Sequence, residues 1–242
     1  DIIWIGTDGQ GVFSYTNDLY TIRSVPLKSF TNHINRPIRA LHLDENGTLW
    51  LGSKGDGIIK IFDYNANSDV LGFKKEYISV DNSNLSDNSV YAIKESRHPI
   101  LWLGTEDGLN YYSYKTNQIE KVDLIYSGTP IKYLHDIYEQ DSIIWLASVG
   151  MGVIKAELKW ELDKPRLKVI DVFVIDDGKM SSNYFYSILP NEHILLAANR
   201  GSGLFFLDTE TNMLSNQVFK DNMLNEIYSI AKDGKNKYLI GT

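Results

Sequence analysis

Titratable side chains are plentiful in this sequence of 242 residues, but their spacing forms no recognised catalytic or metal site. The 31 aspartates and glutamates supply carboxylate pairs throughout, and a glycosidase needs two of them at a separation that sequence alone does not show. None of the histidines forms the close pair typical of metal ligands; they are His33, His42, His98, His135 and His193. The sequence therefore predicts no catalytic residue, no metal and no cofactor.

Three glycine-containing stretches are similar to ligand loops only at first sight. "GSG" (201–203) lacks the outer glycines of a nucleophile elbow. "TDGQG" (7–11) and "KGDG" (54–57) lack the full ligand series of a calcium or phosphate loop. All three fall where the chain is expected to turn between strands, so we interpret them as turns.

The composition excludes several partners. A net charge of −7 and a pI near 5.2 leave no basic surface to bind a phosphate backbone, so we expect no nucleic-acid partner.

The absence of cysteine rules out disulfides, thiolate zinc sites and a cysteine nucleophile. Because the sequence starts at Asp1, inside a strand-like run and without a methionine, we expect it to be a piece of a longer protein.

One stretch recurs about every 47 residues along the chain. It reads "IIWIGT" at 2–7 and "ILWLGT" at 100–105, and a second motif such as "VYAI" (90–93) precedes it from the second copy onward. The segments are short, rich in β-branched and aromatic residues, and separated by Gly, Asn and Asp, which favours strands over helical repeats. The positions that anchor the copies are Trp4, Trp50, Trp102, Trp145, Leu195 and Leu239.

Each copy resolves into four short strands. In the third copy we expect them at 89–95, 100–105, 109–114 and 118–124. Four antiparallel strands per repeat of this length are typical of a β-propeller blade, so the predicted fold is an all-β propeller. We expect complete blades at about 36–80, 87–125, 131–175 and 183–220, with partial blades at 1–27 and 225–242.

The number of blades follows from the repeat length. A closed ring of seven would need more residues than the chain has, so we expect a fragment of a seven-bladed propeller. Six blades closed by pairing the two ends would leave a redundant strand, because both ends carry the same second strand.

A blade cannot bury both faces alone, so neighbouring sheets must stack. We interpret each anchor tryptophan as a wedge between adjacent blades. The small residues two positions after each anchor indicate a crowded approach between sheets; they are Gly6, Gly52, Gly104, Ala147, Ala197 and Gly241. The turn after the second strand carries glycines that suit positive φ, such as Gly9 with Gly11 and Gly55 with Gly57.

A propeller presents a rim around its axis, and the loops that lead into the innermost strands bring polar side chains to it. Amides, cations and phenols from five blades suit sugar hydroxyls, and Arg36 or Lys132 suits an acidic sugar. Tyr133 and Tyr184 could stack on a sugar face. The candidate ligand-binding residues are Arg36, Arg39, Asn88, Tyr91, Lys132, Tyr133, His135, Asn183, Tyr184, Tyr186, Asn225 and Tyr228.

Five of these candidates share one position, the second residue of the motif that precedes each anchor; they are Arg39, Tyr91, His135, Tyr186 and Tyr228. One interpretation packs them between blades with their polar tips hydrogen-bonded, and it is the one we favour. The other places them at the axial binding site.

"NLSDNSVYAIKES" (84–96), followed by "ILWLGTEDGLNYYSYKTNQI" (100–119), resembles the two-component regulator propeller repeat. "PIRALHLDENGTLWLGS" (37–53) carries the middle of the same pattern, and "KMSSNYFYSIL" (179–189) repeats its opening. The resemblance weakens after Trp145, where the Gly-Thr pair is missing. It implies the periplasmic sensor region of a Bacteroidetes hybrid two-component system, anchored to the inner membrane and joined to a histidine kinase.

The resemblance implies a non-enzymatic sensor that recognises an oligosaccharide. Its partners would be a small glycan and the other domains of the same receptor, with a homodimer in the full-length protein. The alternatives are a scaffold that binds another protein and, third, a propeller lyase or glycoside hydrolase. A sialidase-type hydrolase is disfavoured, because the repeated Asp motif of sialidases has its glycine two residues after the aspartate. Here Gly47 follows Asp44 by three residues.

Overall fold

The structure, a computed structural model, is built from β-strands. It describes residues 2–7, 12–16, 21–25, 35–63, 74–175, 183–217, 225–234 and 237–242. These residues contain no α-helix, and their strands form seven sheets, four of which have four strands each. Four-stranded antiparallel sheets are the unit of a propeller blade. The predicted all-β class is therefore confirmed.

The chain divides into two compact units. The first comprises Asp1–Glu106 with Asn110–Lys121, and the second comprises Asp107–Leu109 with Val122–Thr242. The strands of the sheets in the first unit are β1 (Ile2–Gly6), β2 (Val12–Thr16), β3 (Thr21–Val25), β4 (Ile38–Leu43), β5 (Leu49–Ser53), β6 (Ile58–Ile61), β7 (Lys75–Ile78), β8 (Val90–Glu95), β9 (Ile100–Thr105), β10 (Gly108–Ser113) and β11 (Gln118–Val122). Those of the second are β12 (Ile125–Tyr126), β13 (Thr129–Pro130), β14 (Leu134–Gln140), β15 (Ile143–Ser148), β16 (Gly152–Glu161), β17 (Lys164–Phe173), β18 (Phe185–Asn191), β19 (Ile194–Asn199), β20 (Gly203–Asp208), β21 (Leu214–Gln217), β22 (Ser229–Lys232) and β23 (Tyr238–Gly241).

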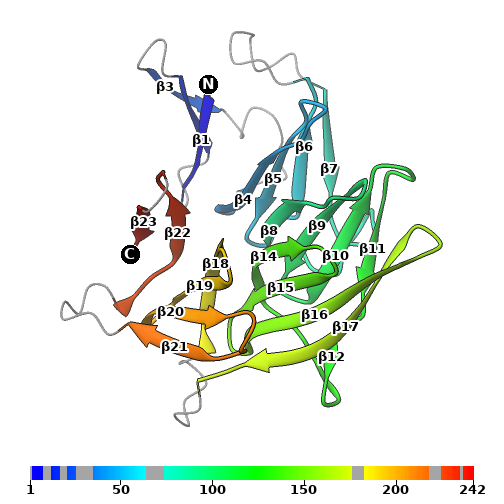
Figure 1. Cartoon of the computed structure of the whole chain (residues 1–242). Coiled ribbons are helices and arrows are strands. Elements are labelled where there is room, and N and C mark those ends of the chain that lie inside the picture. The colour runs from blue at the N-terminus through cyan, green and yellow to red at the C-terminus, as the bar shows by residue number, and fades with distance from the viewer. Residues whose placement is uncertain are drawn as a thin grey trace. The chain divides into compact units, whose positions relative to one another are not determined.

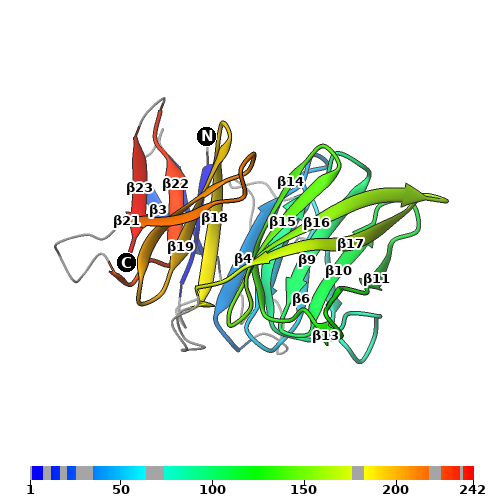
Figure 2. The same ribbon diagram turned by 60° about the horizontal axis from the view of Figure 1, so that its bottom comes forward.

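Successive sheets stack within each unit. In the first, β8 packs against β4 and β5, and in the second, β18 packs against β14 and β15 while β22 packs against β18 (Figure 1). One hairpin departs from the short strands of the other sheets: β16 and β17 have 10 residues each and extend well beyond β14 and β15 (Figure 2). The first strand of each stacked sheet thus lies beside the first strand of the next.

In the first unit, β5 is buried on both faces. Leu49 and Leu51 pack with Ile38 on one side, while Trp50 packs on the other with residues of β8 and β9 such as Val90 and Leu101. Successive side chains of a strand point to opposite faces, so a strand between two neighbours must be apolar throughout. This explains the continuous apolar run and confirms the predicted role of Trp50 as a wedge between sheets.

The second unit repeats this arrangement. Trp145 is 1% exposed and belongs to a cluster with Phe173 of its own sheet and Phe185 of the next. The indole of Trp145 lies 6.0 Å from the Phe173 ring, centroid to centroid. The predicted wedge is therefore confirmed at Trp145 too; the side chain of Trp4, and Gly9 with Gly11, lie outside the described residues.

The strand register corrects the anchor of the fifth copy. In β5, the anchor Trp50 lies three residues before Ser53, which pairs with the first residue of β4. In β19 the residue that pairs with the first residue of β18 is Asn199, so the equivalent anchor is Leu196. The prediction of Leu195, and with it Ala197, is wrong by one position, because this copy has neither the tryptophan nor the glycine that would align it.

The crowding predicted after the anchor is present at Gly52. A Cβ atom there would lie 2.9 Å from Cγ1 of Val90, which belongs to the first strand of the next sheet. Contacts this short do not occur between real side chains, so a larger residue would push the two sheets apart. Glycine at this position therefore sets the spacing between β5 and β8.

Gly57, in the turn before β6, offers a test of the hairpin geometry. Its φ is +80°, and a Cβ atom would clash with the main-chain oxygen of Ile78. We expect Gly57→Ala to lower the free energy of unfolding by about 3 kcal/mol, from backbone strain plus this clash. Gly47→Ala is the control, since Gly47 has a φ of +77° with nothing within 4 Å, and should cost about 1 kcal/mol. Equal losses in urea denaturation would disprove the clash.

Candidate binding site

A β-bulge marks the second residue of the first strand in four sheets. The register shifts between Ile38 and Ala40 in β4, and the same shift occurs in β8, β14 and β18. A bulge inserts one unpaired residue and re-aims its side chain. The residues at the bulges are Arg39, Tyr91, His135 and Tyr186, and Tyr228 occupies the corresponding place just before β22.

In the second unit these side chains stack on one another. The rings of His135 and Tyr186 lie 4.7 Å apart, centroid to centroid, and those of Tyr186 and Tyr228 lie 5.2 Å apart, both edge to face. Edge-to-face geometry is the favourable arrangement of aromatic pairs. We call His135, Tyr186 and Tyr228 the aromatic row. Its outer member, Tyr228, is 39% exposed.

Charged groups border this row. The guanidinium carbon of Arg200 lies 5.9 Å from the ring centroid of Tyr228, within cation–π range. A hydrogen bond with Tyr186 is the main cause that raises the pKa of Arg200, so its charge is permanent. The Tyr228 hydroxyl donates to Oε2 of Glu226 at 3.4 Å. The row thus combines exposed ring surface, a fixed cation and a carboxylate.

The first unit contains the other two bulge residues. Arg39 is exposed and Tyr91 is half-buried. The Tyr91 hydroxyl donates to Oε2 of Glu106 at 3.2 Å. Burial, followed by the negative charge of Glu106, raises the pKa of Tyr91 to about 12, so the phenol remains a neutral donor.

None of the five residues belongs to the hydrophobic clusters that Trp50, Trp145 and Leu196 form between sheets. The rings of His135, Tyr186 and Tyr228 nevertheless contact one another across three successive sheets, and the hydroxyls of Tyr91 and Tyr228 are hydrogen-bonded, as the interpretation that packs these residues between blades expects.

The three asparagine candidates accept hydrogen bonds from backbone amides. The side-chain oxygen of Asn88 accepts from the Val80 amide at 2.9 Å, and that of Asn183 accepts from the Ile175 amide at 2.6 Å. The main-chain oxygens of all three asparagines accept from turn glycines of the preceding sheet, with Asn225 bound by Gly201 at 2.7 Å. These asparagines therefore clasp each turn to the next sheet.

The remaining candidates lie on exposed loops. Lys132 forms an ion pair with Asp107 at 2.6 Å, and Tyr133 is 42% exposed with a φ of +54°. The main-chain amide of Arg36 donates to Oδ2 of Asp56 at 2.7 Å. Tyr184 is half-buried, and its main-chain oxygen accepts from the amide of Arg200 at 3.0 Å.

Three residues near the bulges were missed from the sequence: Arg200, Glu226 and Glu106. Arg200 directly follows the second strand, where the repeat forms an isolated bridge to the loop before the next sheet. This position recurs as Lys54 and Val149. Alignment of the repeats at the residue that follows the second strand, and not at the turn glycines alone, would therefore have pointed to Arg200.

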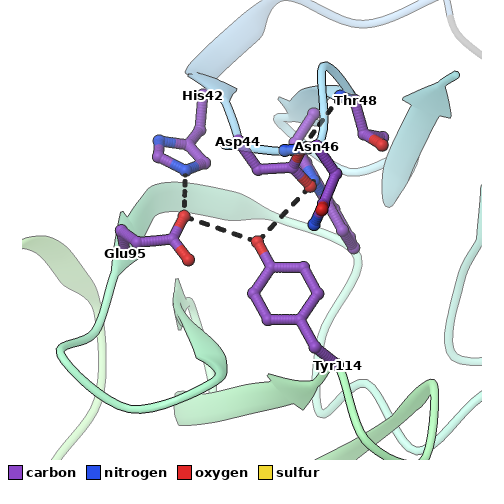
Figure 3. Close-up of polar contacts among 7 residues, drawn as sticks. His42, Asp44, Asn46, Thr48, Glu95 and Tyr114 are labelled. Atoms are coloured by element: carbon purple, nitrogen blue, oxygen red, sulfur yellow. Dashed lines mark hydrogen bonds and ion pairs between the residues drawn. The ribbon is translucent and has the colours of Figure 1, made fainter. Parts of the chain in front are cut away.

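A second polar cluster lies in the first unit at the opposite ends of β4 and β8 (Figure 3). Glu95 Oε2 lies 2.7 Å from Nε2 of His42 and accepts from the Tyr114 hydroxyl at 3.4 Å. Asp44 is 6% exposed and also accepts from the Tyr114 hydroxyl at 3.4 Å. A carboxylate, a histidine and a phenol in contact are the groups that acid–base catalysis uses.

The contacts of this cluster indicate a structural role. Asp44 accepts the main-chain amides of Asn46 and Thr48 and the indole nitrogen of Trp50, which occupies its oxygens. Burial, with the carboxylates of Glu95 and Asp44, raises the pKa of Tyr114 well above its usual value. A phenol that holds its proton is not a general base. The cluster joins β4, β8 and the end of β10.

The part of the chain that the structure describes offers neither a metal site nor a membrane-spanning helix. No group of three or more acidic, histidine or cysteine side chains is placed to hold a metal ion there. Within the same residues, no helix has the length and apolar character needed to cross a membrane.

The chain is similar to known proteins of bacterial signalling. No family model matches it. In sequence it is 28% identical over 189 residues to histidine kinase P4 of Formosa agariphila, a match that covers 76% of this chain and 13% of that protein. The chain therefore spans only a small part of the curated relative it matches.

Solved structures share the fold. The extracellular domain of the hybrid two-component system BT4673 of B. thetaiotaomicron matches 99% of this chain and 44% of its own length, with a TM-score of 0.60 and 16% identity. That of BT3049 from the same organism matches 88% of this chain and 28% of its own length, with a TM-score of 0.60 and 15% identity. The resemblance to the sensor regions of hybrid two-component systems is thus confirmed: this chain has the fold of their extracellular domains and is similar in sequence to part of a histidine kinase.

Proposed function

We propose that the chain is part of the extracellular, ligand-sensing propeller region of a hybrid two-component sensor and that it recognises an oligosaccharide. The fold shared with two extracellular domains and the similarity to a histidine kinase support the sensor role. The partners would be a glycan and the other domains of the receptor, with dimerisation in the full-length protein. The intact propeller would have seven blades and lie in the periplasm, anchored to the inner membrane.

The observation that carries the ligand class is the aromatic row beside Arg200. Sugars present apolar C–H faces that stack on aromatic rings, and hydroxyl rims that need hydrogen-bonding partners. Tyr228 offers a ring that is 39% exposed, and Glu226 and Arg200 lie next to it. A guanidinium also suits a carboxylate or sulfate on the sugar. An acidic oligosaccharide meets all of these groups.

The proposal assigns no catalysis to this region. A sensor needs only a difference in affinity between two arrangements of its domains, so moderate binding is sufficient. Of the polar groups that lie close together, Asp44 and Tyr114 are occupied by the fold. Product formation from any oligosaccharide would instead support a lyase or hydrolase.

A scaffold that binds another protein is the second candidate, and the long hairpin favours it. β16 and β17 extend beyond the rest of their sheet, and Leu162 at the tip is 99% exposed. An exposed apolar side chain on a projecting hairpin is a feature of protein contacts. Binding of a protein that Leu162→Asp abolishes, with no response to any sugar, would select this function.

The test is calorimetry with neutral and acidic oligosaccharides, namely cello-, xylo- and galacturono-oligosaccharides and heparin fragments. We expect heat with at least one of them and a roughly 10-fold weaker affinity for Tyr228→Ala, which removes about 1.4 kcal/mol of ring contact. Tyr126→Ala is the matched control, since Tyr126 lies in the same unit, is 37% exposed and is outside the row. The proposal fails if no sugar gives heat or if both variants lose affinity equally.

A further inference from the structure

A second candidate site lies in the first unit, at the last strands of two of its sheets, β7 and β11. A pocket of about 290 Å³ opens between β7 with the loop that follows it and the hairpin of β10 and β11. Both sides of the pocket belong to the same compact unit. Its volume is near the lower end for ligand pockets, which suits a molecule the size of one sugar ring. Polar side chains from both sheets line it, chiefly Glu76, Asn84, Tyr112, Asn117 and Gln118.

A buried cation binds two of the side chains that line the pocket. Lys60 is 4% exposed, and its Nζ donates to Oε2 of Glu76 at 2.8 Å and to the Tyr112 hydroxyl at 3.1 Å. The same Nζ lies 4.8 Å from the Trp50 ring centroid and 4.7 Å from that of Tyr112. The Tyr112 hydroxyl in turn donates to Oδ1 of Asn117 at 2.7 Å. Tyr112 and Glu76 are therefore fixed before any ligand arrives.

Three polar groups that line the pocket are uncommitted, whereas Asn82 and Ser83 hydrogen-bond to the backbone. Within the described residues, the side-chain amides of Asn84 and Gln118 make no hydrogen bond, and neither does Oε1 of Glu76. The carboxylate oxygen can only accept, whereas each amide both donates and accepts. A ligand must therefore donate to one wall and offer acceptors to the others, and neighbouring hydroxyl groups do both.

The charge of the pocket selects among such ligands. Lys60 forms an ion pair with Glu76 at 2.8 Å, and its Nζ lies 4.7 Å from the ring centroid of Tyr112. The Glu76 side chain lines the pocket and is 50% exposed. An anionic ligand would contact this carboxylate directly, whereas its partner Lys60 is 4% exposed and is not one of the lining residues. A neutral polyhydroxyl compound avoids this repulsion.

We propose that this pocket is a binding site for a single neutral sugar ring or a similar polyol, separate from the aromatic row of the second unit. Glu76 accepts hydroxyl protons, Asn84 and Gln118 donate to ring or hydroxyl oxygens, and Ile78 with Ile119 contacts the apolar edge. Because its walls come from two sheets, an occupied pocket also ties β7 to the hairpin of β10 and β11.

The test is NMR titration of the ¹⁵N-labelled protein with methyl glucoside, methyl galactoside, methyl mannoside and the anion glucuronate. We expect at least one neutral glycoside to shift the side-chain amides of Asn84 and Gln118 saturably in the millimolar range. Glucuronate should bind at least 10-fold more weakly. The double variant Asn84→Ala/Gln118→Ala should weaken the glycoside by at least 10-fold.

Thr116→Ala is the matched control, because Thr116 lies in the same hairpin, is exposed and does not line the pocket. It should leave the titration unchanged, and so should Tyr228→Ala, which separates this site from the proposed function. The inference is overturned if no neutral glycoside shifts the two amides, if glucuronate binds equally well, or if Thr116→Ala weakens binding as much as the double variant.

Discussion

Replacing Asp44 by alanine is expected to lower the free energy of unfolding by about 3 kcal/mol. The carboxylate accepts the amides of Asn46 and Thr48 at 3.0 and 2.9 Å and the indole nitrogen of Trp50 at 2.9 Å. Without it, three donors lose their partner in a site that is 6% exposed. Buried donors left unpaired carry the full cost of their desolvation. Urea denaturation followed by tryptophan fluorescence measures the loss.

Glu45→Ala is the matched control for this prediction. Glu45 is the next residue of the same turn, but it is exposed, so its removal should change stability by no more than about 0.5 kcal/mol. Asp44→Asn should fall near the alanine variant, because an amide nitrogen would face donors that need an acceptor. If Asp44→Ala and Glu45→Ala were equal, the hydrogen bonds in Figure 3 would not hold the turn.

The sequence predicted the strands closely where the repeat kept its landmarks. In the third copy, the expected strands at 100–105 and 118–124 correspond to β9 (Ile100–Thr105) and β11 (Gln118–Val122). Alternation, turn glycines and the Trp-x-Gly pattern all fix the register there. At Leu196 the tryptophan and glycine are both replaced, and the prediction slipped by one residue.

The sequence grouped the candidate residues but did not give their geometry. Residues such as Tyr186 and Tyr228 were singled out because they recur at one place in the repeat. Their direction depends on a bulge, which inserts no characteristic residue and so leaves no mark in the sequence. The sequence also could not separate Asn88, whose amide oxygen binds the backbone at 2.9 Å, from a residue that faces a ligand.

A lysine opposite the anchor tryptophan was overlooked altogether. Lys60 pairs with Trp50 across β5 and β6, and Lys155 pairs with Trp145 across β15 and β16. Lys155 lies 5.0 Å from the Trp145 ring centroid and donates to Asn212 of the next sheet at 2.9 Å. A lysine in a strand usually indicates a solvated face. Here its ammonium joins neighbouring sheets because an aromatic ring and polar acceptors surround it.

Removal of the wedge itself should have the largest effect. We expect Trp50→Ala to lower the free energy of unfolding by about 4 kcal/mol, as for other large buried aromatic residues. Trp50 is 1% exposed, packs at 4.7 Å on the Tyr112 ring and donates to Asp44 at 2.9 Å. Its loss leaves a cavity between two sheets and deprives Lys60 of one of its ring contacts. Urea denaturation followed by circular dichroism measures the change.

The chain supplies its own control for this variant. Leu196 takes the anchor position in β19, where it packs with Ile227 and Ile230, so the repeat tolerates leucine there. Trp50→Leu should therefore cost about half as much as Trp50→Ala, because it refills much of the cavity but leaves Asp44 without the indole donor. If the leucine variant were as unstable as the alanine variant, Trp50 would stabilise the packing of the sheets through its polar contacts and not through its volume. An alanine variant that lost less than about 1 kcal/mol would refute the wedge.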